Sequence, residues 1–289
     1  MYLFLILKVP KERAESIEEE IYLYEKLSWE TEEKEEEVLF KFYIPISLND
    51  QDKEKLFFVE ALASKFDDIH LEYALTKREN WEVIWKYHFK PLEIGKKLII
   101  LPSWEEELRV TERIPIYIDP GQAFGTGHHP TTQLMLENIE YFLEELCQKF
   151  EDPYILDMGC GTGILSIACA KLCPKAIIYA VDIDELALEA AKKNITLNQI
   201  ASPLYILREL PKEENLKFNL ILANIGTKEL KNLAPTFKKL SRPKETLLLL
   251  SGILKEDLME IVKFYRNFSF RPIKSQYLRE WALIAFKVM

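Results

Sequence analysis

The chain has 289 residues, is 48% hydrophobic and carries a formal net charge of −9 at pH 7. This length and apolar content suit a cytoplasmic protein with one full core and room for a second, smaller domain. The apolar run at residues 2–8 is too short to span a membrane and lacks a basic leader. We therefore expect a first strand there, and neither a signal peptide nor a membrane anchor.

The charge is concentrated at the N-terminal end. Residues 1–75 contain 19 acidic and 9 basic side chains, a balance of −10, whereas the remainder has a balance of +1. An acidic module repels a phosphate backbone and attracts a basic partner, which disfavours nucleic acid as its ligand. A solvated acidic surface without a partner, including residues 30–37, is the alternative that charge alone leaves open.

Periodicity in the acidic segment predicts strands and helices in the order βαββαβ, which is a ferredoxin-like split motif. The predicted elements are strand 2–9, helix 11–27, a short strand near Trp29, strand 37–44, helix 50–65 and strand 69–75. Residues 76–118 follow, with three tryptophans among charges and prolines. Such a composition predicts a connector that packs on something, not a disordered linker.

The remainder, residues 119–289, alternates strand and helix patterns. The predicted elements are strand 155–158 with a helix from 164, strand 176–181 with a helix from 185, strand 219–223, helix 227–240, strand 246–250, helix 254–266, and strands near 270–278 and 281–287. The alternation predicts an α/β domain with a doubly wound sheet that ends in a hairpin.

A glycine-rich turn, Asp157-Met-Gly-Cys-Gly-Thr-Gly163, joins the first of these strands to its helix. Glycines let the backbone approach a ligand closely, and the helix offers free N–H groups to it. Because Ile164 stands where a dinucleotide fingerprint has glycine, the spacing disfavours NAD. Asp157 favours a cationic ligand without phosphate. S-adenosylmethionine meets that description, with Asp157, Gly159 and Gly161 as candidate contacts.

The next predicted strand ends at Asp182, about twenty residues beyond the turn, where a carboxylate accepts ribose hydroxyls in such folds. The alternative is that the glycines form only a structural turn. In that case Asp182 or Asp184 merely caps the helix that starts at Glu185.

The four cysteines, at 147, 160, 169 and 173, form no C-x-x-C pair and have no histidine at metal-ligand spacing. The pattern suggests neither a zinc site nor a disulfide framework, so we expect core thiols. Cys160 lies inside the glycine turn and is expected to pack under the ligand, since no base neighbours it.

Between connector and glycine turn lies a loop, residues 119–132, with three glycines, two prolines and the adjacent pair His128 and His129. Here the chain resembles the PrmA family, the methyltransferases of large-subunit ribosomal protein eleven, whose signature is D-P-G-x-A-F-G-T-G-x-H-P-T-T. The resemblance covers nearly the whole chain. It extends through residues 80–85, 89–91, 102–104, the glycine turn, 223–225 and 250–254.

The resemblance implies a class I (Rossmann-like) methyltransferase domain at 119–289, behind an N-terminal module at 1–75 that docks the ribosomal protein, free or on the ribosome. It implies cofactor contacts at Thr132, Gly159, Asp182 and Asn224, and Phe124 of the signature loop joins this set. The chain departs from the family pattern twice, with His128 in place of Thr and Gly226 in place of Leu. Both departures flank the expected acceptor site.

Methyl transfer from a sulfonium is an in-line displacement, so the enzyme must mainly hold the acceptor nitrogen in line. Asn224 ends a predicted strand and is placed to accept an N–H from the amine. Ile225 and Gly226 offer no flat face for a planar acceptor, which favours an aliphatic amine. A lysine must lose its proton first, at a cost of about 4 to 5 kcal/mol at pH 7 unless burial lowers its pKa.

The loop around Phe124 is the candidate for that desolvation, and His129 is the candidate proton acceptor. Two histidines beside a proline also suit a purely structural loop, and the sequence leaves both roles open.

Three other functions compete with methylation of ribosomal protein eleven. An NAD-dependent oxidoreductase is disfavoured by Ile164. A methyltransferase of RNA is disfavoured by the acidic first domain, although another protein substrate is compatible with it. A non-enzymatic module that binds S-adenosylmethionine requires an inert acceptor loop.

Overall fold

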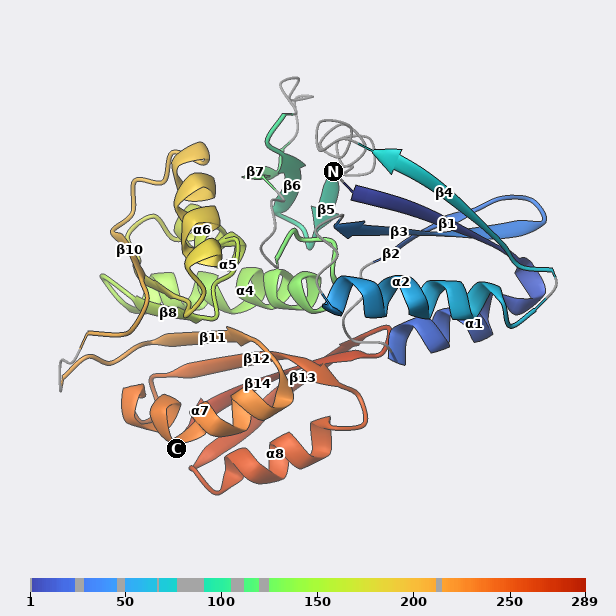
Figure 1. Cartoon of the computed structure of the whole chain (residues 1–289). Helices are drawn as coiled ribbons and strands as arrows, with labels where there is room; N and C mark the ends of the chain where they lie inside the picture. The colour runs from blue at the N-terminus through green and yellow to red at the C-terminus, as the bar shows by residue number, and fades with distance from the viewer. Residues whose placement is uncertain are drawn as a thin grey trace. The chain divides into compact units, whose positions relative to one another are not determined.

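The computed structural model describes residues 2–23, 29–45, 50–66, 68–76, 91–104, 112–119, 125–211 and 215–289. Figure 1 traces their course. The chain forms two compact units, Met1–Phe89 and Lys90–Met289. None of the helices in the described residues is long and apolar enough to cross a membrane.

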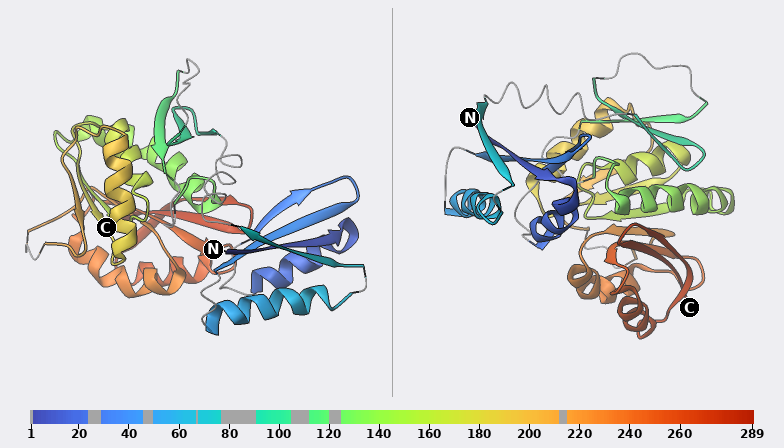
Figure 2. Two further views of the ribbon diagram at one scale, coloured as in Figure 1. Left: turned by 45° about the horizontal axis from the view of Figure 1, so that its top comes forward. Right: turned by 90° about the vertical axis from the view of Figure 1, so that its right-hand side faces the viewer.

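The first unit is a four-stranded antiparallel sheet with two helices on one face (Figure 2). Its elements are β1 (Tyr2–Pro10), α1 (Lys11–Leu23), β2 (Trp29–Glu33), β3 (Glu37–Pro45), α2 (Asp50–Ala63) and β4 (His70–Thr76), with strand order β2-β3-β1-β4. Leu5, Leu7 and Val9 alternate along β1 and are fully buried against the helices. The predicted order of elements is therefore confirmed.

Several basic side chains of this unit are paired with its own carboxylates. Arg13 contacts Asp68 at 2.8 Å and Lys65 contacts Glu20 at 2.6 Å, while Lys8 pairs with Glu72 and Lys41 with Glu32. Each pair uses one acid for one base, so these ion pairs do not reduce the excess of acidic residues in the unit.

A three-stranded sheet follows, in the part of the chain where the sequence predicts a connector. Its strands are β5 (Leu92–Ile94), β6 (Leu98–Pro102) and β7 (Ile114–Ile118). The side chain of Asn198 accepts the N–H of Tyr117 at 2.9 Å and donates to the carbonyl oxygen of Tyr117 at 2.6 Å. Asn194 accepts the N–H of Asp119 at 2.8 Å. These strands are thus held to helix α6 (Glu185–Leu197) and belong to the second unit, which begins at residue 90 and not at 119.

The main sheet has seven strands in the order β10-β9-β8-β11-β12-β14-β13. Helices α4, α5 and α6 cover one face, and α7 and α8 cover the other (Figures 1 and 2). The remaining elements are α4 (Pro130–Lys149), β8 (Tyr154–Met158), α5 (Ile164–Leu172), β9 (Ile177–Val181), β10 (Leu204–Leu207), β11 (Leu220–Asn224), α7 (Thr227–Leu240), β12 (Leu247–Leu254), α8 (Leu258–Arg266), β13 (Phe270–Leu278) and β14 (Trp281–Val288). Strands β10, β9, β8, β11 and β12 pair in parallel, whereas β14 pairs antiparallel with both β12 and β13. This confirms the predicted doubly wound sheet and its final hairpin.

The cysteine prediction is partly wrong. Cys147 and Cys173 form a disulfide that joins the end of α4 to the end of α5, with their Cα atoms 6.0 Å apart. They are 26 residues apart in sequence, and only the packing of α4 against α5 brings them together. Cys160 and Cys169 are buried free thiols, as expected. Burial raises the pKa of both thiols, so neither is a ready nucleophile.

Candidate functional site

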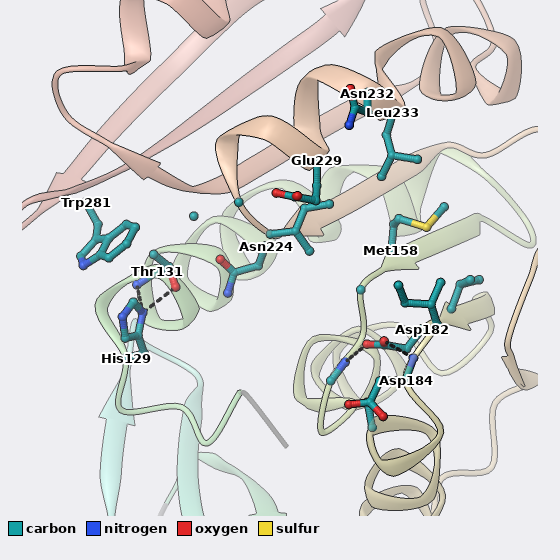
Figure 3. A pocket seen from close by; sticks show the side chains of 18 residues that line it. His129, Thr131, Met158, Asp182, Asp184, Asn224, Glu229, Asn232, Leu233 and Trp281 are labelled. Atoms are coloured by element: carbon teal, nitrogen blue, oxygen red, sulfur yellow. Dashed lines mark hydrogen bonds between the residues drawn. The ribbon is translucent and has the colours of Figure 1, made fainter. Parts of the chain in front are cut away.

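A cavity of about 750 Å³ opens in the second unit at the carboxyl ends of β8, β9 and β11 (Figure 3). Its wall comes from the glycine turn, the ends of β9 and β11, the first turns of α4 and α7, and the chain around Gly252 and Trp281. The carboxyl edge at the centre of a doubly wound sheet is where such folds bind ligands. The cavity therefore lies where the sequence motifs predict a site.

The glycine turn has a backbone that only glycine adopts without strain. Gly159, Gly161 and Gly163 have φ values of 75°, 53° and 79°. A Cβ on Gly159 would lie 2.5 Å from the Cγ2 of Ile225. The turn thus brings bare backbone to the cavity wall, and Gly159 and Gly161 both line it.

Asp182 joins this turn to the end of β9. Its Oδ2 accepts the N–H of Gly161 at 2.9 Å, and its Oδ1 accepts the N–H of Asp184 at 3.0 Å. Asp184 caps α6 by accepting the N–H of Leu186 at 3.0 Å. Capping therefore falls to Asp184, and Asp182 is held on the cavity wall with lone pairs left for a ligand.

Asp157 lies beneath the turn and does not line the cavity. Its side chain is completely buried, and its Oδ2 accepts from the N–H and hydroxyl of Ser166 at 3.1 and 2.7 Å. Within the described residues its Oδ1 has no hydrogen-bond partner. Burial raises the pKa of Asp157 to about 6, opposed by Ser166 and assisted by the charge of Asp182. The predicted cofactor contact of Asp157 stays a prediction.

The raised pKa of Asp157 predicts a pH dependence of folding stability. The folded state binds this proton more tightly than the unfolded chain, so the stabilisation is complete below pH 3.8 and lost as pH rises to about 6. Across that window the free energy of unfolding of the wild type should fall, relative to Asp157→Asn, by up to about 1.4 kcal/mol per pH unit. Urea titrations of both proteins between pH 4.5 and 7 measure it, and parallel curves would contradict it.

Asn224 ends β11 and turns its amide into the cavity (Figure 3). Its Nδ2 lies 3.5 Å from the Oγ1 of Thr132, and its buried Oδ1 has no hydrogen-bond partner in the described part of the chain. Thr132 is itself fully buried in the first turn of α4 and does not line the cavity, whereas Thr131 does. Thr132 therefore sits behind Asn224 and contacts its amide nitrogen.

The position of His129 bears on the two roles that the sequence leaves open. It lines the cavity and is also the N-cap of α4, where its Nδ1 accepts the N–H of Thr131 at 3.3 Å. Burial lowers its pKa, so the ring is neutral at pH 7. With Nδ1 used as an acceptor, the neutral ring carries its proton on Nε2. This arrangement favours the structural role.

Several cavity residues are not among the sequence-predicted contacts, and two of them, Trp281 and Glu229, carry polar groups that bear on binding. Trp281 stacks edge-to-face on His129 with ring centroids 5.1 Å apart, and its indole N–H is buried without a partner in the described residues. Glu229, in the first turn of α7, also lines the cavity with Asn224 (Figure 3). Phe124 lies outside the described residues, and its predicted contact stays a prediction.

Comparisons with known proteins identify the family of this chain. The model of the family described as Ribosomal protein L11 methyltransferase (PrmA) matches residues 6–288. The protein of that name from Thermoanaerobacter pseudethanolicus is 35% identical over 247 residues, which cover 84% of this chain and 77% of that protein. The one from Caldanaerobacter subterraneus subsp. tengcongensis is 33% identical over 260 residues, covering 88% and 81%.

A solved structure gives the same result. The ribosomal protein L11 methylase from Lactobacillus delbrueckii subsp. bulgaricus aligns with a TM-score of 0.59 and 30% identity, over 69% of this chain and 99% of that one. With the family model matching almost every residue, the resemblance predicted from the signature loop is confirmed. The chain belongs to the ribosomal protein L11 methyltransferase (PrmA) family.

Proposed function

We propose that this protein transfers methyl groups from S-adenosylmethionine to amino groups of ribosomal protein L11, on lysine side chains, the N-terminal α-amine or both. The observation that carries the proposal is Asn224 Oδ1, a buried acceptor without a partner in the described residues, at the edge of a ligand-sized cavity. Such an atom needs an N–H donor, and an amine substrate supplies one.

The cavity fits the cofactor in two respects. Asp182 presents a carboxylate at one end, suited to the two ribose hydroxyls, and the bare backbone at Gly159 leaves room for close approach. Asn224 lies toward the other end (Figure 3). When bound, S-adenosylmethionine supplies an electrophilic methyl group on a sulfonium.

The acceptor side follows from the chain's own groups. Asn224 Oδ1 accepts one N–H of the neutral amine, which directs the nitrogen lone pair away from the amide and into the cavity. Thr132, which does not line the cavity, accepts from the Nδ2 of Asn224 at 3.5 Å. The apolar side chains of Met158, Ile225 and Leu233 on the wall disfavour the charged amine and lower its pKa. The amine releases its proton to solvent.

The N-terminal unit is proposed to dock the substrate protein in the cytoplasm, as a ferredoxin-like module. Its strand order and the two helices on one face support the module type. Its charge balance supports a basic partner, because its described ion pairs leave acidic residues in excess. Charge of this sign raises the association rate with a basic protein and repels bare RNA.

The test is mass spectrometry of unmethylated ribosomal protein L11 after incubation with this protein and S-adenosylmethionine, beside a ribosomal RNA control. We expect mass gains in whole methyl units on lysine or the α-amine of the protein. Methylated RNA with unmodified protein would support an RNA methyltransferase. No gain on either, with S-adenosylmethionine still bound, would mean that the acceptor is a different molecule.

A further inference from the structure

A carboxylate occupies the space that a side chain at Gly226 would fill. Gly226 is the N-cap of α7, with φ −61° and ψ 153°, a conformation open to any residue. A Cβ built there would lie 2.6 Å from the Oε2 of Glu229. Because the backbone does not require glycine, the effect of glycine at 226 is to admit this carboxylate to the cavity wall.

The Glu229 carboxylate lies between Trp281 and Asp182 in the view of Figure 3, on the cavity wall that Asn224 also lines. The other titratable groups on that wall are His129 on the Trp281 side and Asp182 and Asp184 on the opposite side, beyond Asn224 in this view. No cation lines the cavity in the described part of the chain, and Glu229 makes no ion pair there. An anion in this position is complementary to a cation that enters beside Asn224.

A carboxylate one turn into a helix also interacts favourably with the helix N-terminus, which is the alternative role for Glu229. That role stabilises α7 and predicts no effect on substrate recognition. Glutamine serves nearly as well at this position of a capping box, so Glu229→Gln separates the two roles.

We propose that Glu229 binds the acceptor amine in its ammonium form, and that glycine at 226 creates this subsite. The inference rests on the proposed function. Glu229 is thus a substrate-binding residue for a cationic aliphatic amine, and Asn224 receives the amine once its proton has left to solvent.

Kinetics of L11 methylation test this assignment. Glu229→Gln should raise KM for L11 about fivefold, the scale of a partly exposed charge pair. By linkage, a fivefold tighter hold on the ammonium raises the pKa of the bound amine by about 0.7. The rising limb of kcat against pH should therefore move about 0.7 pH unit lower in the variant. A merely structural Glu229 leaves that limb in place.

Gly226→Ala supplies an independent arm, because its Cβ displaces the carboxylate without straining the backbone. It should reproduce both shifts, and the double variant should be no worse than Glu229→Gln alone. Glu260→Gln is the matched control, an exposed glutamate on α8 that pairs with Lys231 outside the cavity. Unchanged KM and pH limb in Glu229→Gln, or additive effects in the double variant, would overturn the proposal.

A binding measurement separates failure of this inference from failure of the proposed function. N-acetyl-lysine methylamide and its norleucine counterpart are titrated by NMR into the protein saturated with S-adenosylhomocysteine. The wild type should prefer the lysine derivative, and Glu229→Gln should lose about fivefold of that preference. If L11 stays unmethylated but this preference exists, the subsite stands and the substrate is wrong. Equal binding of both derivatives, or no binding of either, rejects the subsite.

Discussion

Replacing Asn224 with alanine is expected to lower kcat for L11 methylation by about 100- to 1,000-fold, the scale seen when one positioning or charge-stabilising group is removed. The reason is geometric. Asn224 Oδ1 is buried at the cavity edge without a partner in the described residues, so the substrate amine is its natural donor. Without it the nitrogen lone pair is no longer held in line with the methyl group.

The same variant should keep most of its affinity for S-adenosylmethionine, because Asp182 and the glycine turn are unchanged. We expect a change in the dissociation constant of less than about tenfold, measured by calorimetry. Asn232→Ala is the control, since it removes another asparagine amide from the cavity wall. An Asn224→Ala protein with wild-type kcat would show that the amide does not orient the acceptor. Loss of turnover in Asn224→Ala with cofactor binding kept would favour an enzyme over a module that only binds S-adenosylmethionine.

The features predicted correctly from sequence are those that depend on short stretches of chain. The glycine turn, the acid at 182 and the asparagine at 224 each end a buried strand, and parallel strands bring their carboxyl ends to one edge. The final hairpin also follows from local alternation. Local patterns therefore predicted that these three features meet at one edge of the sheet.

The features that were missed depend on contacts between distant segments. The Cys147–Cys173 disulfide exists because α4 and α5 pack together, and the sheet at 92–118 is held to α6 by buried asparagines. Trp281 comes to the site only because β14 lies next to β12 in the sheet. Residue spacing encodes none of these distances.

Asp157 shows a subtler limit. It stands at the position before the glycine turn that suggests a ligand contact, yet its side chain turns into the protein and bonds Ser166. Alternation along β8 decides the face, and the next residue, Met158, lines the cavity instead. The residue type in a motif thus predicts which chemical group is present better than it predicts which way the side chain points.

Gly252→Ala is expected to cause the largest loss of stability among the substitutions considered, about 2 to 5 kcal/mol in the free energy of unfolding, from backbone strain and overpacking together. Gly252 has φ 83°, at an irregularity where β12 shifts register against β14 between Leu250 and Ile253. A Cβ there would lie 2.3 Å from the carbonyl oxygen of Ile225 and 3.1 Å from its nitrogen. These are main-chain atoms, which cannot swing aside as the end of a side chain can.

The nearest obstacle is the carbonyl group of Ile225, the residue after Asn224, so the same substitution should reach the chemistry. Any relief of the clash moves the end of β11, and a displacement of about 1 Å at an orienting group costs about 100-fold in rate.

Gly95→Ala is the control. Its φ of 53° imposes comparable strain, but its Cβ would meet only the Glu140 side chain, away from the cavity. The measurements are the free energy of unfolding in urea and kcat for L11 methylation, the latter at a temperature where both variants are folded. If both variants lose stability but only Gly252→Ala loses kcat, glycine at 252 sets the position of Asn224. If both variants keep a normal kcat, the end of β11 tolerates the shift.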